Sequence, residues 1–409
     1  MRDHQRYYPV RNEDGSLMPY FLTVRNGGTK ALENVQHGNE KVLRARLDDA
    51  KFFFENDRKK TLEGHRDDLT RINYQEGMGD MRDKADRLQK LTEAIGKDWG
   101  FTAEEAADAD RAAFLSKSDL ATGMVTEFTE LQGEMGKEYA LLDGEKPEVA
   151  QAIFEQYMPR FAGDILPQQE IGRALSLADK LDNLAATFLR GLIPTGSQDP
   201  FALRRQTIGA VNILTDGKIH WDIRRGIEAA LALLPGDEET KKTVLSQIED
   251  FFRQRIKAIM LDEGIAYDII DAVLAGPVDD IYALFLKARS MAESQLKDEA
   301  ELRQAVTRLA NITKGKTGGK VDPSLFTEDV EKKLQDAFEA VSAKALPLFA
   351  SYEYGKALPA LKELTAPIND YLDNVMVMVD DEAVKNNRIS QLLATLALFN
   401  TWGDFSKLV

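Results

Sequence analysis

Apolar residues recur at helical spacing along nearly the whole chain after about residue 30. In residues 38–57 the apolar positions fall on one stripe, made of Val42, Leu43, Leu47, Ala50, Phe53 and Phe54. Such a stripe is typical of an amphipathic helix that buries one face. A capping-box pattern at Thr102 and Glu105 marks the start of a later helix. The spacing therefore predicts a mainly α-helical protein.

The first 25 residues are the exception to this helical pattern. Residues 7–10 and 18–24 are rich in aromatic and β-branched residues, and the turn sequence 12–16 separates them. This arrangement predicts a β-hairpin. A hairpin alone is barely stable in water. We therefore expect partner strands outside this chain, which would then be the later part of a longer protein.

A length of 409 residues is more than one ordinary domain holds. We expect the end of a β-containing domain with long linker helices over residues 1–97, then a helical domain over residues 98–235. A helical connector over residues 236–275 and a last helical domain over residues 276–409 complete the predicted organisation. Three glycines, three lysines and a proline in residues 311–324 predict a flexible loop within that last domain.

Composition restricts the class of protein further. An apolar fraction of 43% supports packed cores, and no apolar run approaches the roughly 20 residues that span a membrane. The N-terminal sequence has no apolar stretch like that of a signal peptide. Without cysteine there can be no disulfide, no thiol nucleophile and no thiolate metal site. We therefore expect a cytoplasmic protein that has no membrane partner.

No motif for ATP binding or catalysis is complete in this sequence. Gly315-Lys316-Thr317 is similar to the end of a phosphate-binding loop, but the glycine that should stand five residues earlier is Ala310. The signatures of class I and class II adenylation sites, the nucleophile elbow and the dinucleotide-binding fingerprint are absent as well. We therefore expect no catalytic residue and no bound cofactor in this chain.

Short segments of residues 98–235 occur in the order seen in helical HD-type phosphohydrolase domains. They are Lys117-Ser118-Asp119-Leu120, Gln156-Tyr157-Met158-Pro159 and Asp179-Lys180. Those enzymes hold a metal ion with histidine and aspartate, and the metal activates water. Here no histidine lies between His65 and His220, and Asp119 and Asp179 alone cannot make such a site. We expect an HD-like scaffold without metal ligands; a metal-dependent phosphohydrolase is the alternative.

The net charge of −15 argues against binding nucleic acid by bulk attraction, so a basic surface must be local. Residues 302–321 contain no Asp or Glu. Their five cations are Arg303, Arg308, Lys314, Lys316 and Lys320. Cations placed in this way suit contacts with RNA phosphates. A solvated helix end, where cations favour the helix dipole, explains them equally well.

Two further pairs of residues are weaker candidates for RNA contacts. Asn387 and Arg388 carry donors and acceptors that could reach nucleotide bases, although a polar helix face is the simpler interpretation. Arg204 and Arg205 open a helix and could hold another part of an RNA. Paired arginines are, however, common at exposed helix starts.

Residues 179–205 join a helix to a rigid turn and then to a basic helix, with Asp199 as the expected N-cap and Pro200 as the first helical residue. The amino-acid sequence of this turn, PTGSQDPFALRR, resembles the corresponding sequence of the bacterial glycyl-tRNA synthetase β subunit family. Four other strings resemble the family in the same order along essentially the whole chain. They are HQRYYPV with YFLTVRNG, GNEKVLRARLDDAKFFFE, KSDLATGMVTEFTELQGEMGKEYA, and NVMVMVDDEAVKNNR with DFSKLV.

The resemblance implies an α₂β₂ enzyme that joins glycine to tRNA-Gly with ATP and Mg, in which the α subunit carries the class II catalytic core. The β subunit mainly recognises tRNA, and this chain would be its C-terminal portion. Residues 98–235 would be an HD-like domain near the acceptor end, and the region after about residue 290 would resemble the helical DALR-like anticodon-binding domain of arginyl-tRNA synthetases.

On this basis we expect the chain to bind tRNA rather than to catalyse. The five cations of residues 302–321 would contact the anticodon stem backbone, Asn387 and Arg388 would lie near the bases, and Arg204 and Arg205 would hold another part of the tRNA. A helical scaffold that only holds the α subunit, with no selective RNA contact, is a further alternative.

Overall fold

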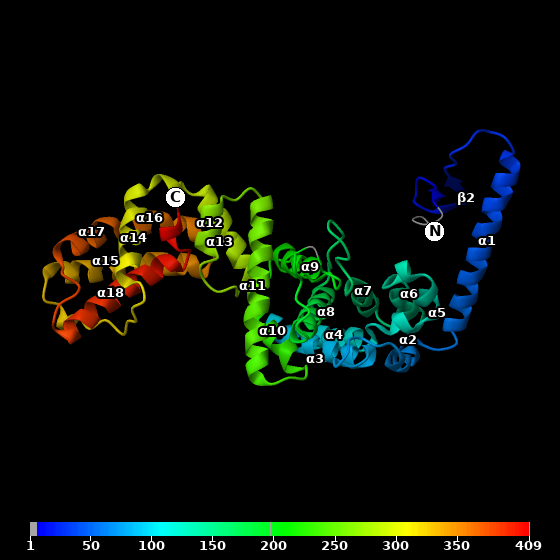
Figure 1. Cartoon of the computed structure of the whole chain (residues 1–409), viewed down its shortest axis with the longest axis horizontal. Helices are drawn as coiled ribbons and strands as arrows, with labels where there is room; N and C mark the ends of the chain where they lie inside the picture. The colour runs from blue at the N-terminus through cyan, green and yellow to red at the C-terminus, as the bar shows by residue number, and fades with distance from the viewer. Residues whose placement is uncertain (1–5, 197, 409) are drawn as a thin grey trace. The chain divides into compact units, whose positions relative to one another are not determined.

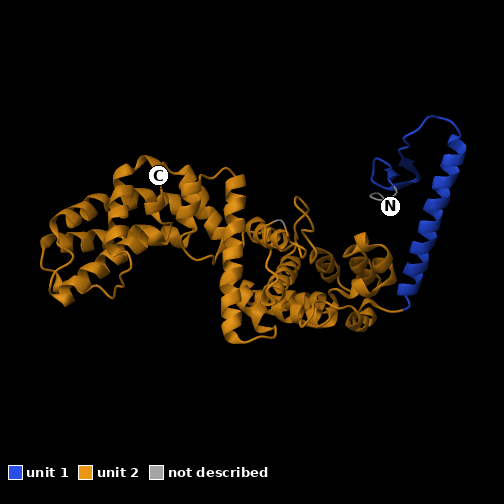
Figure 2. Cartoon of the chain, in the orientation of Figure 1, with its two compact units in different colours: residues 1–59 blue, residues 60–409 orange. Residues whose placement is uncertain are grey.

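The computed structural model describes residues 6–196 and 198–408. His4, which begins one of the family-like strings, and Ser197, which lies in the predicted turn, are outside the described residues. The chain divides into two compact units, residues 1–59 and residues 60–409 (Figure 2). Its described part contains eighteen α-helices and two β-strands (Figure 1). The prediction of a mainly α-helical protein is confirmed.

The first unit consists of a hairpin followed by one long helix. Strands β1 (Tyr7–Arg11) and β2 (Leu17–Thr23) pair antiparallel, as predicted, with a register shift between Pro9 and Arg11. Helix α1 (Leu32–Asp57) follows. The predicted apolar stripe of α1 is not a buried face, because Val42 is 44% exposed and Leu47 is 54% exposed. The unit leaves this face uncovered, and a groove of about 780 Å³ lies between β2 and α1.

The second unit begins with a bundle of helices around α8. Its helices in chain order are α2 (Leu62–His65), α3 (Met81–Trp99), α4 (Ala103–Leu115), α5 (Gly123–Glu127), α6 (Glu134–Leu142), α7 (Pro147–Glu155) and α8 (Glu170–Leu189). Thr102 and Glu105 form the predicted capping box at the start of α4. Helix α8 is central, because it contacts α3, α4 and α7 as well as three helices that follow it in the chain.

The middle of the unit contains α9 (Leu203–Asp216), α10 (Ile223–Ala232), α11 (Glu238–Asp262), α12 (Tyr267–Val273) and α13 (Ile281–Glu293). The N-cap residue of α9 is Ala202 and not Asp199 as predicted, but the Asp199 carboxylate does accept hydrogen bonds from the backbone N–H groups of Leu203 (2.8 Å) and Arg204 (3.0 Å). The helix nevertheless begins at Leu203, three residues later than predicted, because Ala202 adopts the left-handed conformation. Helix α11 packs against α8, α9, α10 and α12.

The last helices are α14 (Ala300–Thr313), α15 (Asp329–Ala350), α16 (Leu358–Lys362), α17 (Thr365–Asn374) and α18 (Glu382–Asn400). Helix α14 packs against α17 and α18, and Trp402 and Phe405 are fully buried beyond α18. Among the described residues no helix is both long and apolar enough to cross a membrane. The predicted internal boundaries at residues 97, 235 and 275 stay predictions; the first lies inside α3.

Candidate functional site

A buried cluster of ion pairs lies where α8 meets α3 and the turn after α4. Lys84 lies 2.8 Å from Asp182 and 2.9 Å from Asp179, and Lys117 lies 2.9 Å from the other oxygen of Asp179. Arg87 donates two hydrogen bonds to Asp182, at 2.6 and 3.2 Å. Burial by itself would raise the pKa of Asp179. The ammonium groups of Lys117 and Lys84 have the larger combined effect, and they hold the pKa below its usual range. Asp179 is therefore a charged and fully paired carboxylate.

Asp119, the other candidate from the HD-like segments, is also satisfied by protein groups. Its two oxygens accept hydrogen bonds from the Gly133 N–H (2.7 Å) and the Tyr157 hydroxyl (2.9 Å), and burial raises its pKa. Within residues 6–196 and 198–408 no group of three or more His, Cys, Asp or Glu side chains could hold a metal ion. At Asp179 a lysine ammonium group already lies 2.9 Å from each carboxylate oxygen. The alternative of a metal-dependent phosphohydrolase has no support in this geometry.

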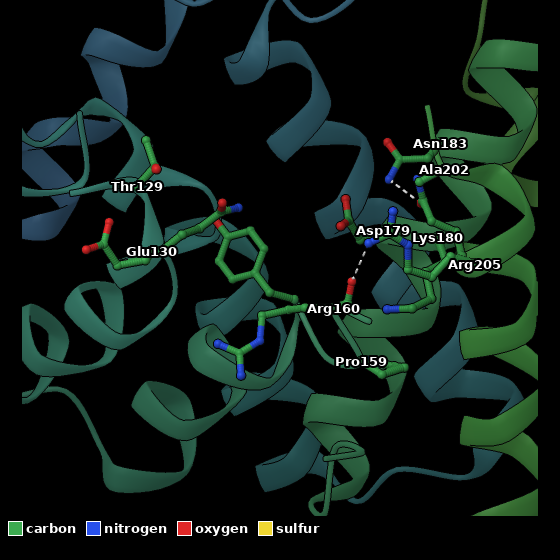
Figure 3. A pocket seen from close by; sticks show the side chains of 12 residues that line it. Thr129, Glu130, Pro159, Arg160, Asp179, Lys180, Asn183, Ala202 and Arg205 are labelled. Atoms are coloured by element: carbon green, nitrogen blue, oxygen red, sulfur yellow. Dashed lines mark hydrogen bonds between the residues drawn. The ribbon is translucent and has the colours of Figure 1, made fainter. Parts of the chain in front are cut away.

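A pocket of about 350 Å³ opens beside this cluster (Figure 3). Asp179, Lys180, Asn183 and Arg205 lie together at one side of it, and Thr129 and Glu130 lie at the opposite side (Figure 3). The first three come from α8 and Arg205 comes from α9. The Lys180 ammonium donates to the Met158 carbonyl (2.6 Å) and the Ser176 hydroxyl (2.7 Å). Burial lowers the pKa of Lys180 to about 7.

The structure separates the five cations predicted in residues 302–321 into two groups. Lys314 and Lys320 are exposed on the loop after α14, and Lys316 lies half-buried with its amine 3.5 Å from the Met378 sulfur. The arginines lie on α14 and are engaged with protein: Arg303 donates to the Lys297 carbonyl at 3.1 Å, and Arg308 pairs with Asp373 at 2.5 Å. The loop lysines are therefore the more accessible cations.

The glycine-rich loop after α14 is docked on α18, although its composition predicts flexibility. A Cβ atom at Gly318 would lie 2.9 Å from Leu393 Cδ1 and 3.1 Å from Ser390 Cα, so a larger residue there would require the loop or its neighbours to shift. The Gly319 N–H donates to the Ser390 hydroxyl at 2.9 Å. The backbone of Asp322 exchanges two hydrogen bonds with the Asn387 side chain, at 2.7 and 2.9 Å.

The positions of Asn387 and Arg388 correct the prediction that they lie near the RNA bases. They are 5% and 4% exposed, and Asn387 holds the loop in place. Arg388 pairs with the fully buried Glu331 at 2.9 Å, and it also donates to Thr327 and to the Met376 carbonyl. Base contact would break these buried bonds. The sequence shows the donors and acceptors but not which face of α18 is buried.

Arg204 and Arg205 differ in their surroundings although they are adjacent. Arg204 donates to the Gly196 carbonyl at 2.7 Å and so holds the turn before α9. Arg205 is exposed at the edge of the 350 Å³ pocket and donates to the Arg160 carbonyl at 3.1 Å.

Sequence reasoning missed Lys84, Arg87 and Lys180. A usable signal was the pair Asp179 and Asp182, which lie three residues apart, and therefore on neighbouring positions of one helix surface, in a helix rich in Leu and Ala.

The chain is similar to two family models. Residues 1–275 match the model described as glycyl-tRNA synthetase beta subunit, and residues 302–403 match the model described as DALR anticodon binding domain. The second match spans α14 to α18 and therefore includes the lysine loop.

Three curated relatives, each named glycine–tRNA ligase beta subunit, match over the full length of this chain. The protein from Clostridioides difficile strain 630 is 45% identical over 410 residues, which is 100% of this chain and 59% of that protein. The proteins from Desulforamulus reducens and Shouchella clausii are each 42% identical, with 59% and 60% of their lengths covered. The chain thus spans about 60% of the length of these relatives. Whether it corresponds to their C-terminal portion stays a prediction.

Proposed function

The chain belongs to the glycyl-tRNA synthetase beta subunit family, and we propose from this premise that it is a tRNA-recognition part of a glycine–tRNA ligase. The complete enzyme would attach glycine to tRNA-Gly with ATP and Mg. An alpha subunit would supply the adenylation site, in an α₂β₂ assembly. This chain would itself carry no catalytic residue and bind no ATP, and the enzyme would work in the cytoplasm.

The observation that carries the proposal is the position of the loop lysines. Lys314, Lys316 and Lys320 follow α14 inside the region that is similar to an anticodon-binding domain. The loop is held on α18 by Gly319 and Asp322, so its ammonium groups are presented from a fixed backbone. Each such contact with an RNA phosphate releases counterions and adds salt dependence to binding.

A second contact region is proposed in the HD-like part, which would lie near the acceptor end of the tRNA. Arg205 is its exposed cation, whereas Arg204 supports the turn that positions α9. On α14, Arg303 and Arg308 would contact the anticodon stem backbone while they keep their hydrogen bonds to the Lys297 carbonyl and to Asn369. The alpha subunit would bind to surfaces of this chain other than the two proposed tRNA contact regions.

The proposal is tested by fluorescence anisotropy of this chain with labelled tRNA-Gly and with an anticodon-substituted tRNA, each at several salt concentrations. The double charge reversal Lys314→Glu with Lys316→Glu should weaken binding and reduce the slope of log K against log salt by about 1 to 2. Lys242→Glu is the matched control, since it reverses an exposed lysine on α11, outside the region similar to an anticodon-binding domain.

The outcomes separate the alternatives. Tighter binding of the cognate anticodon supports base reading, and equal, steeply salt-dependent binding of both RNAs leaves a backbone contact alone. An affinity and slope unchanged by the loop substitutions remove the loop from the proposal. If neither RNA binds, the chain is better described as a scaffold for the alpha subunit.

A further inference from the structure

The pocket beside the buried ion pairs has a cationic side that is not neutralised by carboxylates. Among the described residues the Lys180 ammonium donates to a carbonyl and a hydroxyl but to no carboxylate. The nearest acidic group on its helix, Asp179, already has a lysine ammonium 2.9 Å from each of its oxygens. An anion that entered the pocket could therefore pair with the Lys180 ammonium group.

The position of Lys180 is fixed by close packing. A Cβ atom at Gly209 on α9 would lie 2.9 Å from the Lys180 Cε, so glycine at this position makes room for the lysine stem. Its ammonium group donates hydrogen bonds to the Met158 carbonyl and the Ser176 hydroxyl. A side chain that is 4% exposed and held at both ends is a preorganised donor.

Arg205 adds a second cation beside the same space, and Asn183 lies next to it. Within the part of the chain that the structure describes, Arg205 makes one hydrogen bond, to the Arg160 carbonyl at 3.1 Å, so further N–H groups of its guanidinium remain for a ligand. Asn183 is oriented by bonds from Tyr74 (2.8 Å) and Lys84 (2.9 Å), and it donates to Gln206 at 2.7 Å. Figure 3 shows Lys180, Asn183 and Arg205 on one side of the pocket.

We propose that this pocket binds a phosphoryl group, with Lys180 and Arg205 as its two cationic donors. A fixed ammonium together with a planar guanidinium fork suits a tetrahedral oxyanion. The volume of about 350 Å³ falls in the range of small-ligand pockets, so a nucleoside can accompany the phosphate. The phosphate can belong to a free mononucleotide or to an RNA chain. The site shares Arg205 with the proposed tRNA contact region, but binding of phosphate or AMP tests it separately from that role.

Anion binding at this pocket should weaken as pH rises through neutrality. Burial lowers the pKa of Lys180 to about 7, and the like charges of Lys117 and Lys84 act in the same direction while Asp179 opposes them. The other charged or titratable groups that line the pocket are Glu130, Tyr157, Arg160 and Arg205. Arg160 is paired with Asp164 at 2.9 Å. Lys180 is therefore the group whose change of charge should set the pH dependence of binding near neutrality.

The experiment is isothermal titration calorimetry of the whole chain with inorganic phosphate and with AMP. Arg205→Gln and Lys180→Gln should each lower the affinity about tenfold or more, since each removes a charged hydrogen bond. Arg224→Gln, an exposed arginine on α10 outside the pocket, is the control and should leave the affinity unchanged. If Lys180→Gln fails to fold by circular dichroism, the exposed Arg205→Gln decides. Absence of binding of both probes by the wild type, or equal affinity in the variants, overturns the site.

Two further arms identify the source of the phosphate and the role of Lys180. Competition of AMP binding by a short single-stranded RNA assigns the pocket to an RNA phosphate, and AMP binding without competition assigns it to a mononucleotide. Sulfate, which stays a dianion over this range, should bind less tightly as pH rises from about 6 to about 8. The pH dependence should disappear in Lys180→Gln; if the wild type shows none, Lys180 is not the donor.

Discussion

Asp182 lies 1% exposed at its side chain between two cationic partners, Lys84 and Arg87. Replacing it by alanine would leave both cations buried without their anion, which typically costs about 3–5 kcal/mol. Asp182→Ala should therefore lower the free energy of unfolding by about that amount in urea titrations. Glu93→Ala, which breaks a surface pair with Lys97, should cost no more than about 0.5 kcal/mol. Equal losses in the two variants would contradict a structural role of the cluster.

Lys180 should also give stability a pH dependence of known sign. Its folded-state pKa, about 7, lies below the ordinary lysine pKa of 10.5, so between these values the unfolded chain binds more protons than the folded chain. The stability of the wild type should therefore rise between about pH 7 and pH 10 relative to that of Lys180→Met. Chemical unfolding at several pH values measures this difference. A constant difference would show that Lys180 titrates alike in the folded and unfolded chains.

At the scale of elements, the loop after α14 depends on one side chain of α18. Asn387→Ala removes both hydrogen bonds to the Asp322 backbone, each worth about 0.5–1.5 kcal/mol. Amide hydrogen exchange over residues 315–322 should become faster, with little change in the core of α8. The exposed neighbour Asn386→Ala is the control. Exchange in Asn387→Ala that stays as slow as in the wild type would show that Gly318 packing and the Gly319–Ser390 hydrogen bond hold the loop without Asn387.

The helices themselves were largely predictable, because apolar spacing and caps such as Thr102 with Glu105 are local signals. The roles of Asn387 and Arg388 were not, since the partner of Arg388 is Glu331, fifty-seven positions earlier in the chain. The pocket was missed for the same reason: Lys180 and Arg205 come from different helices. Composition also misled at Gly318, where glycine allows close packing rather than mobility.

At the scale of the whole molecule, the second compact unit, residues 60–409, should stay folded without the first, residues 1–59. Among the described residues of the first unit only Tyr7 and Asp57 are buried. Limited trypsin digestion should therefore cut at the exposed Lys59 or Lys60 and leave residues from about 60 onward folded. The thermal midpoint of that fragment should match the main transition of the intact chain. A fragment that unfolds much earlier would show that the first unit supports the second.

The pairing of Asp179 with Lys84 and Lys117 also affects how this fold can evolve. The positive charge beside the carboxylate is part of the polypeptide, so folding of this region should be indifferent to chelators: dialysis against EDTA should leave the thermal midpoint unchanged. Evolution of a metal site here would need several simultaneous replacements, because a histidine at position 117 alone would leave the Lys84 ammonium 2.9 Å from Asp179, where it would repel the ion. Both lysines would have to be replaced before a metal ion could bind beside Asp179.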